Sequence, residues 1–366
     1  MSSEEENLSE LPLYGDILQH ILGRLPLIHL LPALHVSRSW SHAVRSSLLH
    51  LNPSKPWLLL HHSHSHSPLP RPATAYDPSS LHWLRLQRPA CPATGTLRSS
   101  GNMLYAISPS KISFSVDPLH LTWHHLDGPL VWRADPIVAL VGRSVVVAGG
   151  ACDFEDDPMA VETYDLDAGT WSSCDSMPSV LRDCPASTCL SVASVGDNMY
   201  VMEKATGALH VYDALKMTWE GPVDLGIAGE GRWWAIGGMR GGLVVAAGGL
   251  VSGKGVRVWE VEVGTWRVGE MGEIPGEMAG KFGEGGRSMG VCCSDRGWAY
   301  VYGGGEGGEV AWCELGGKGK EGGWKWGWVE EGDDEVRTEA VLTCGDVGLE
   351  ELDLAMMMPG VEVHLL

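Results

Sequence analysis

The sequence predicts an all-β propeller of six blades that is preceded by a small all-α module. The first observation behind this prediction is a run of apolar residues at helical spacing within residues 8–50. The second is a repeat with a period of about 50 residues that extends across residues 51–345. We expect residues 1–7 to form a flexible N-terminus and residues 346–366 to form a C-terminal tail.

The helical module is small and strongly apolar. Its first predicted helix carries leucine and isoleucine residues between positions 18 and 25 at spacings that place them on one face. Pro12 suits the first turn of this helix, and Pro26 ends it. A second apolar run begins at Leu30 and reaches Trp40. Because so small a module cannot bury all of these side chains by itself, we expect it to dock against another protein.

The order of these residues resembles the F-box, the helical motif by which substrate receptors bind the Skp-type adaptor of cullin-RING ubiquitin ligases. Two positions depart from the usual motif, since Gly15 interrupts its acidic opening and Ser37 replaces its common cysteine. The resemblance implies that the adaptor, and through it a cullin-RING ligase, is a partner of this chain. The residues that it implies as adaptor contacts are Leu11, Pro12, Ile17, Ile21, Leu22, Leu25, Pro26, Leu30 and Trp40.

The repeat is marked by an acidic residue that is followed six positions later by tryptophan. Its five copies are Asp77 to Trp83, Asp117 to Trp123, Asp165 to Trp171, Asp213 to Trp219, and Glu260 to Trp266. Each copy predicts a strand, a tight turn and a second strand, and we expect each tryptophan to pack between blades. A sixth, less regular unit spans residues 288–329. Its final tryptophan is one of three: Trp324, Trp326 or Trp328.

These units, together with β-branched runs that end in paired glycines such as 145–150, resemble the kelch repeat of β-propellers. The strand pattern at 338–345 has no blade of its own, whereas the first blade lacks an inner strand before Trp57. We therefore expect the C-terminal strand to complete the first blade and close the ring, which leaves no open sheet edge.

An F-box before kelch repeats resembles the plant-type F-box/kelch receptors. Within that group, residues 137–162 are similar to the proteins that target enzymes of phenylpropanoid and flavonoid synthesis, with chalcone synthase the nearest candidate. The resemblance implies a non-catalytic substrate-recognition subunit, whose propeller binds a protein substrate for ubiquitination and proteasomal degradation. Two alternatives stay open: a kelch scaffold with a vestigial F-box, and a propeller enzyme or small-molecule binder.

Charge and composition exclude other classes of protein. Residues 1–150 carry a net charge of +2 and residues 151–366 a net charge of −22, which together make −20. An acidic surface of this size repels the phosphates of nucleic acids. No apolar run approaches the roughly 20 residues that cross a bilayer, and the nine cysteines show no CxxC pair. We expect a protein of the cytoplasm, the nucleus or both that contacts neither nucleic acid nor membrane.

Three short motifs suggest a cofactor or a metal. In GGLVSGKG at 248–255, Gly255 stands where a P-loop needs a hydroxyl, and a strand pattern follows where a P-loop needs a helix. GGGEGG at 303–308 is also followed by a strand pattern. The histidines at 61–66 fit a solvated loop better than a metal site. We therefore predict no cofactor, no metal and no catalytic residue.

The lengths of the loops indicate where the propeller binds its target. In a four-stranded blade, loops 2–3 and 4–1 lie on one face of the propeller, and the long connections of this sequence all belong to that face. We call it the long-loop face and expect it to bind the target. Its aromatic and arginine residues have the chemistry of interface anchors. The candidate anchors are Trp132, Arg133, Phe154, Arg232, Trp233, Trp234 and Phe282.

Overall fold

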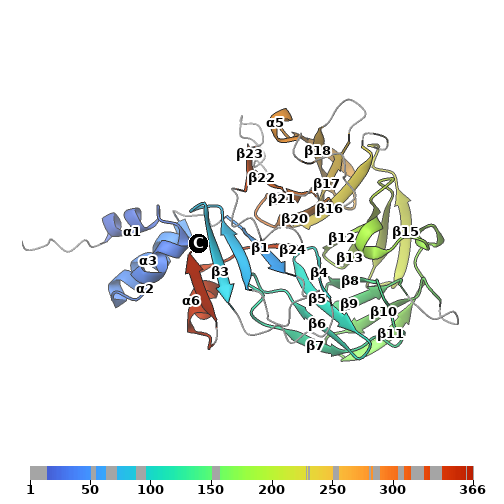
Figure 1. Cartoon of the computed structure of the whole chain (residues 1–366), viewed down its shortest axis with the longest axis horizontal. Coiled ribbons are helices and arrows are strands. Elements are labelled where there is room, and N and C mark those ends of the chain that lie inside the picture. The colour runs from blue at the N-terminus through green and yellow to red at the C-terminus, as the bar shows by residue number, and fades with distance from the viewer. Residues whose placement is uncertain are drawn as a thin grey trace, which may run out of the picture.

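The computed structural model describes residues 15–50, 55–62, 72–87, 96–150, 157–227, 229, 231–249, 255–279, 282, 289–303, 309–314, 325–329, 340–359 and 361–365. A helical module lies at one end of the molecule, and six antiparallel sheets form a ring beside it (Figure 1). The predicted fold, a six-bladed propeller after a small helical module, is thereby confirmed.

The helical module consists of α1 (Asp16–Leu22), α2 (Leu27–Leu34) and α3 (Arg38–His50). Asp16 lies in the first turn of α1, where a carboxylate complements the positive end of the helix, and the helix ends at Gly23. Ser37 begins α3 as a cap, because its Oγ accepts a hydrogen bond from the backbone N–H of Trp40 at 3.2 Å. Within the described parts of the chain, no helix combines the length and the apolar character that a membrane span requires.

Five of the six blades have four strands each. From the central channel outward, blade 2 consists of β4 (Leu97–Ser100), β5 (Met103–Ser108), β6 (Lys111–Ser115) and β7 (His124–Asp127), and blade 3 of β8 (Ile137–Val141), β9 (Ser144–Ala148), β10 (Val161–Asp165) and β11 (Thr170–Cys174). In the same order, blade 4 consists of β12 (Leu190–Val195), β13 (Asn198–Glu203), β14 (Leu209–Asp213) and β15 (Thr218–Val223), and blade 5 of β16 (Trp233–Met239), β17 (Gly242–Gly248), β18 (Val256–Glu262) and β19 (Arg267–Glu273). Blade 6 consists of β20 (Gly290–Ser294), β21 (Trp298–Tyr302), β22 (Val310–Glu314) and β23 (Lys325–Trp328). Short helices lie in two of the connections: η1 (Ser179–Leu181) and α4 (Ala186–Cys189) between β11 and β12, and α5 (Gly276–Ala279) between β19 and β20.

Blade 1 joins strands from the two ends of the propeller sequence. Its order is β24 (Ala340–Gly345), β1 (Trp57–His62), β2 (Ala73–Asp77), β3 (His82–Gln87) and β25 (Glu362–Leu365). β24 pairs antiparallel with β1 in an unbroken register that runs from Trp57 opposite Gly345 to His62 opposite Ala340. β24 also contacts β20 of blade 6 and β4 of blade 2, so the inner strands form a closed ring.

The segment expected as a C-terminal tail is instead folded. It forms α6 (Leu349–Met357) and then β25, which pairs with β3 as a fifth, outermost strand of blade 1. The physical reason is that this segment has its own apolar face. Its buried side chains are Val347, Leu349, Leu352, Ala355 and Val361.

Three tryptophans of the repeat occupy equivalent places on the outer strands. Each lies opposite a tyrosine of the neighbouring strand, with ring centroids 5.1–5.2 Å apart. The pairs are Tyr76 with Trp83, Tyr164 with Trp171, and Tyr212 with Trp219. Trp171 packs against the core between blades 2 and 3, and Trp219 against the core between blades 3 and 4. These three tryptophans therefore support the blades, as their spacing predicts.

In the other two copies of the repeat, the tryptophan does not lie opposite the aromatic residue of the neighbouring strand. In blade 2, His124 rather than Trp123 lies opposite the aromatic residue, and its ring stacks on Phe114. In blade 5, the carbonyl of Glu262 accepts the turn hydrogen bond from the N–H of Trp266, so Glu262 and not Glu260 begins the turn. Trp266 consequently lies in the turn itself, with a φ of 56°.

Candidate functional site

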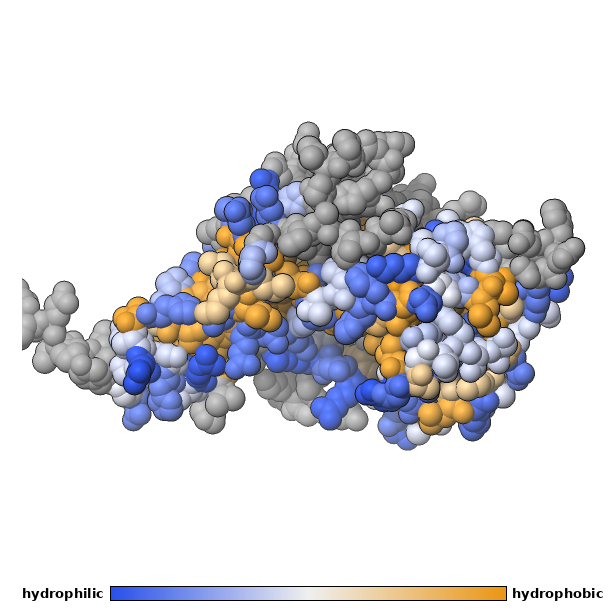
Figure 2. Space-filling model, turned by 90° about the horizontal axis from the view of Figure 1, so that it is seen from below, coloured by the Kyte–Doolittle hydropathy of each residue, from blue (hydrophilic) through white to orange (hydrophobic). Residues whose placement is uncertain are grey.

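The exposed apolar side chains of α1 form the first candidate surface. Ile17 and Ile21 are 64% and 45% exposed, and they are separated by one helical turn, so both lie on the same side of α1. Leu18 and Leu22, on the other side, are buried, and α1 contacts α3. Figure 2 shows apolar residues gathered at the end of the molecule that carries the helical module.

The structure divides the other predicted adaptor contacts into two groups. Leu22 and Leu30 are buried in the core, Leu30 completely, so neither side chain lies on the surface that an adaptor would contact in this structure. Leu25, Pro26 and Trp40 are half-buried, and Leu25 and Trp40 pack against the same core. The remaining two predicted residues, Leu11 and Pro12, lie outside the described residues. Apolar spacing identified the helices, but it could not separate the apolar residues that face inward from those that face outward.

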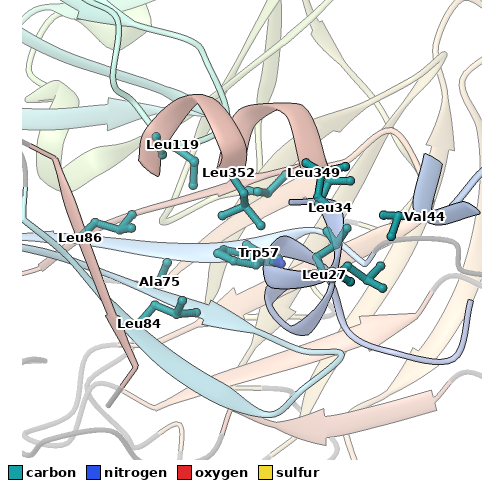
Figure 3. Close-up of a cluster of buried hydrophobic side chains, with 14 of the residues drawn as sticks. Leu27, Leu34, Val44, Trp57, Ala75, Leu84, Leu86, Leu119, Leu349 and Leu352 are labelled. Carbon is teal, nitrogen blue, oxygen red and sulfur yellow. The ribbon is translucent and has the colours of Figure 1, made fainter. Parts of the chain in front are cut away.

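The helical module and the propeller share one hydrophobic core. Leu27 and Leu34 of α2 face Leu349 and Leu352 of α6, and the ring of Trp57 lies between these helices and the sheet of blade 1 (Figure 3). The sheet contributes further buried residues to this core: Ala75, Leu84 and Leu86.

Polar contacts also join the module to α6. His35, at the end of α2, lies 2.9 Å from the carboxylate of Asp353, and Arg45 of α3 donates to Glu350 at 3.1 Å. Because a packed core and these contacts hold the two parts together, the helical module and the propeller keep a fixed mutual orientation.

The long-loop face presents only some of the predicted target anchors. Trp132 is 37% exposed, and Arg232 is also exposed. Trp233 is half-buried, and its ring lies against Gly248 so closely that a Cβ there would come within 1.8 Å of it. Phe154 lies outside the described residues.

Three predicted anchors are buried, so their side chains do not lie on the surface of the long-loop face. Trp234 stacks on Trp259, Phe282 stacks on Trp328, and Arg133 is completely buried. Arg133 donates to the carboxylate of Glu162 and to the carbonyls of Gly149 and Ala160. A charge usually indicates exposure, but here four hydrogen bonds replace the water that a buried guanidinium loses.

Two cavities lie at the ends of the central channel. The cavity at the long-loop face has a volume of about 290 Å³, and Arg98, Ser187, Lys204 and Tyr302 are among its lining residues. The cavity at the opposite face has a volume of about 800 Å³ and is lined by turns such as 196–197 and 240–241. Sequence reasoning did not identify the first cavity, because its residues come from different blades and share no motif. Among the residues that the structure describes, no three His, Cys, Asp or Glu side chains are placed to hold a metal ion.

Comparisons with known proteins agree with this arrangement. The model of the F-box domain family matches residues 8–52, which contain all three helices of the module. A curated relative, F-box/kelch-repeat protein At1g23390 of Arabidopsis thaliana, is 36% identical over 367 residues, and the match covers 93% of this chain and 91% of the relative. The similarity therefore extends across the module and the propeller together.

Proposed function

The chain belongs to the F-box/kelch-repeat protein family, and on this premise we propose that it is the substrate-recognition subunit of a Skp–cullin–F-box ubiquitin ligase. It carries out no catalysis. The helical module binds the Skp-type adaptor, and the long-loop face of the propeller binds a target protein in the cytoplasm or nucleus. The attached cullin-RING ligase then ubiquitinates the target for proteasomal degradation, because tethering raises the effective concentration of target lysines.

The observation that carries this proposal is the exposed pair Ile17 and Ile21 inside the segment that matches the F-box domain. Their neighbours Leu18 and Leu22 are buried, so the helix is already packed on its inner side. Two large apolar side chains that remain exposed on a packed helix are suited to a partner that covers them. We assign them as adaptor contacts, together with the predicted Leu11 and Pro12.

Co-purification with a purified Skp-type adaptor tests the proposal. We expect the double variant Ile17→Asp, Ile21→Asp to lose the adaptor while its melting temperature stays unchanged, since both side chains point to solvent. Leu215→Asp is the control, because Leu215 is a strongly exposed apolar residue in the turn after β14 of blade 4. Adaptor binding by the double variant at the wild-type level would contradict the assigned surface. Failure of the wild-type chain to bind any Skp-type adaptor would favour a scaffold with a vestigial F-box.

We also propose chalcone synthase, or another enzyme of phenylpropanoid and flavonoid synthesis, as the target. The support is the resemblance of residues 137–162 alone. In the structure these residues form β8, β9 and the start of β10, and most of their described apolar side chains are buried. The test is the half-life of chalcone synthase in cells with and without this chain. A half-life that shortens with the chain and recovers under proteasome inhibition supports the target, and an unchanged half-life excludes it.

A further inference from the structure

The cavity at the long-loop face lies where a bound target would reach the central channel. It is lined by the first residues of the inner strands β4, β8, β12, β20 and β24, which all begin on this face. Asp135 follows Trp132 in the same loop, and its partner Arg98 lines the cavity. The side chains of Arg98 and Asp135 are about one quarter exposed, so the cavity is open to solvent. It is therefore continuous with the proposed target-binding face.

Among the residues that the structure describes, two cations and one carboxylate set the charge at this cavity. Arg98 forms an ion pair with one carboxylate oxygen of Asp135. The other oxygen accepts hydrogen bonds from the N–H of Ser187 at 3.2 Å and from its Oγ at 2.9 Å. Asp135 is thus fully engaged by Arg98 and Ser187.

Lys204 is the second cation, and its charge is not balanced. Within the described part of the chain its Nζ has no carboxylate partner, and it donates only to the carbonyl of Ser187 at the long distance of 3.4 Å. Burial lowers the pKa of Lys204 below its ordinary value. A half-buried ammonium with a single weak acceptor gains from a new anionic partner, since charge-assisted hydrogen bonds are about twice as strong as neutral ones.

The charge at the cavity also contrasts with the rest of the chain. Of the described residues there, Arg98, Lys204 and Asp135 together carry one net positive charge, whereas residues 151–366 carry a net charge of −22 in the sequence. The net charge of −20 on the whole chain weakens the approach of an acidic protein in general, so an anion bound here needs a direct contact with Lys204. The volume of about 290 Å³ holds a side chain but is small for most cofactors.

We propose that this cavity receives one aspartate or glutamate side chain of the target protein, with Lys204 as its ionic partner and Arg98 as a neighbouring donor. The proposal rests on the proposed function and deepens it, because it states the chemistry that the long-loop face recognises.

The test uses the full chain, with and without the Skp-type adaptor, and a library of random peptides whose bound members are sequenced. We expect enrichment of aspartate or glutamate at one position. Lys204→Met should weaken binding of an enriched peptide about tenfold or more, since a hydrogen bond to a charged group is lost. Lys204→Arg should retain most of the binding. Lys216→Met, a lysine variant on the opposite face, should have no effect.

Three outcomes would overturn the proposal. They are enriched peptides without an acidic position, unchanged peptide binding by a folded Lys204→Met variant, and stronger binding of a phosphoserine peptide than of its glutamate counterpart. Melting temperature and gel filtration establish that each variant is folded. Adaptor binding is measured on the same preparations, so loss of the proposed function and loss of the acidic site are distinguishable.

Discussion

Arg133 and Glu162 form an ion pair inside the propeller, with 2.9 Å between Nη2 and Oε2 and almost no solvent exposure of either side chain. Glu162 also accepts hydrogen bonds from the N–H groups of Leu130 and Val131. These contacts with Glu162 therefore fix the loop before β8 to strand β10. Trp132, which lies between the fixed residues, is partly exposed on the long-loop face.

Glu162→Ala should lower the free energy of unfolding by about 3–5 kcal/mol, because it leaves the buried Arg133 without a counter-charge. Chemical denaturation measures the effect. The control is Arg143→Met, which breaks the exposed ion pair with Asp167 and should change stability little. A Glu162→Ala variant as stable as the wild type would show that the loop does not depend on this pair.

The shared core makes a second prediction at α6. Leu352→Ala should lower the free energy of unfolding by about 2–5 kcal/mol, because Leu352 is fully buried between α2 and blade 1. Leu354→Ala, two residues further on the exposed side of α6, should change it by less than about 0.5 kcal/mol.

Hydrogen exchange distinguishes a shared core from two separate ones. In the Leu352→Ala variant, amide exchange should accelerate both in α2 and in β1, since both pack on the lost side chain. Faster exchange in α6 alone would contradict the conclusion that module and propeller are one packed unit.

His210 should make the stability of the protein sensitive to acid. Its side chain is buried, neither ring nitrogen has a hydrogen-bond partner among the described residues, and burial lowers its pKa from the ordinary 6.5. Between that lowered pKa and 6.5 the unfolded chain binds more protons than the folded chain, so the free energy of unfolding falls as the pH drops through this window.

His210→Leu should therefore lose less stability than the wild type between about pH 7 and about pH 5, as measured by urea denaturation at each pH. His42→Gln, at an exposed histidine of α3, should retain the wild-type pH dependence. Equal pH dependence in His210→Leu and the wild type would show that another group dominates this window.

The two kinds of repeat tryptophan should differ in their contribution to stability. Trp219→Ala should cost about 3 kcal/mol, since Trp219 packs on Tyr212 and on the core between blades 3 and 4. Trp123→Ala should cost only about 1 kcal/mol, because His124 occupies the equivalent place in blade 2. Thermal unfolding of the full chain compares them, and equal losses would show that Trp123 also supports its blade.

Much of the fold was predictable because the same side-chain packing recurs in several blades and therefore repeats in the sequence. Trp83, Trp171 and Trp219 recur at the same spacing since each fills the same space beside a tyrosine. Glu260 and Trp266 have the same spacing, but the turn of blade 5 begins two residues after Glu260, at Glu262. Spacing alone therefore placed this turn incorrectly. α6 and β25 escaped prediction because they occur once and therefore produce no repeat signal.

The candidate site was less predictable, because exposure depends on packing between segments that are distant in sequence. Leu30 and Ile21 belong to the same apolar pattern, yet one is buried and the other exposed. Arg133 resembles a surface anchor in the sequence, but Glu162 and two carbonyls surround it. Arg98 and Lys204 line one cavity only because the ring brings blades 2 and 4 to the same channel.

The core shared by α2 and α6 also has a consequence for the order of synthesis. α2 leaves the ribosome early, whereas α6, which covers it, follows only after all six blades have been translated. At usual rates of translation this interval is roughly 15–60 s. A nascent chain therefore exposes the apolar inner side of α2 until the ring has closed. The core beneath the helical module can therefore be completed only after the propeller has been translated, and a chain arrested within the propeller leaves apolar surface exposed, which favours aggregation.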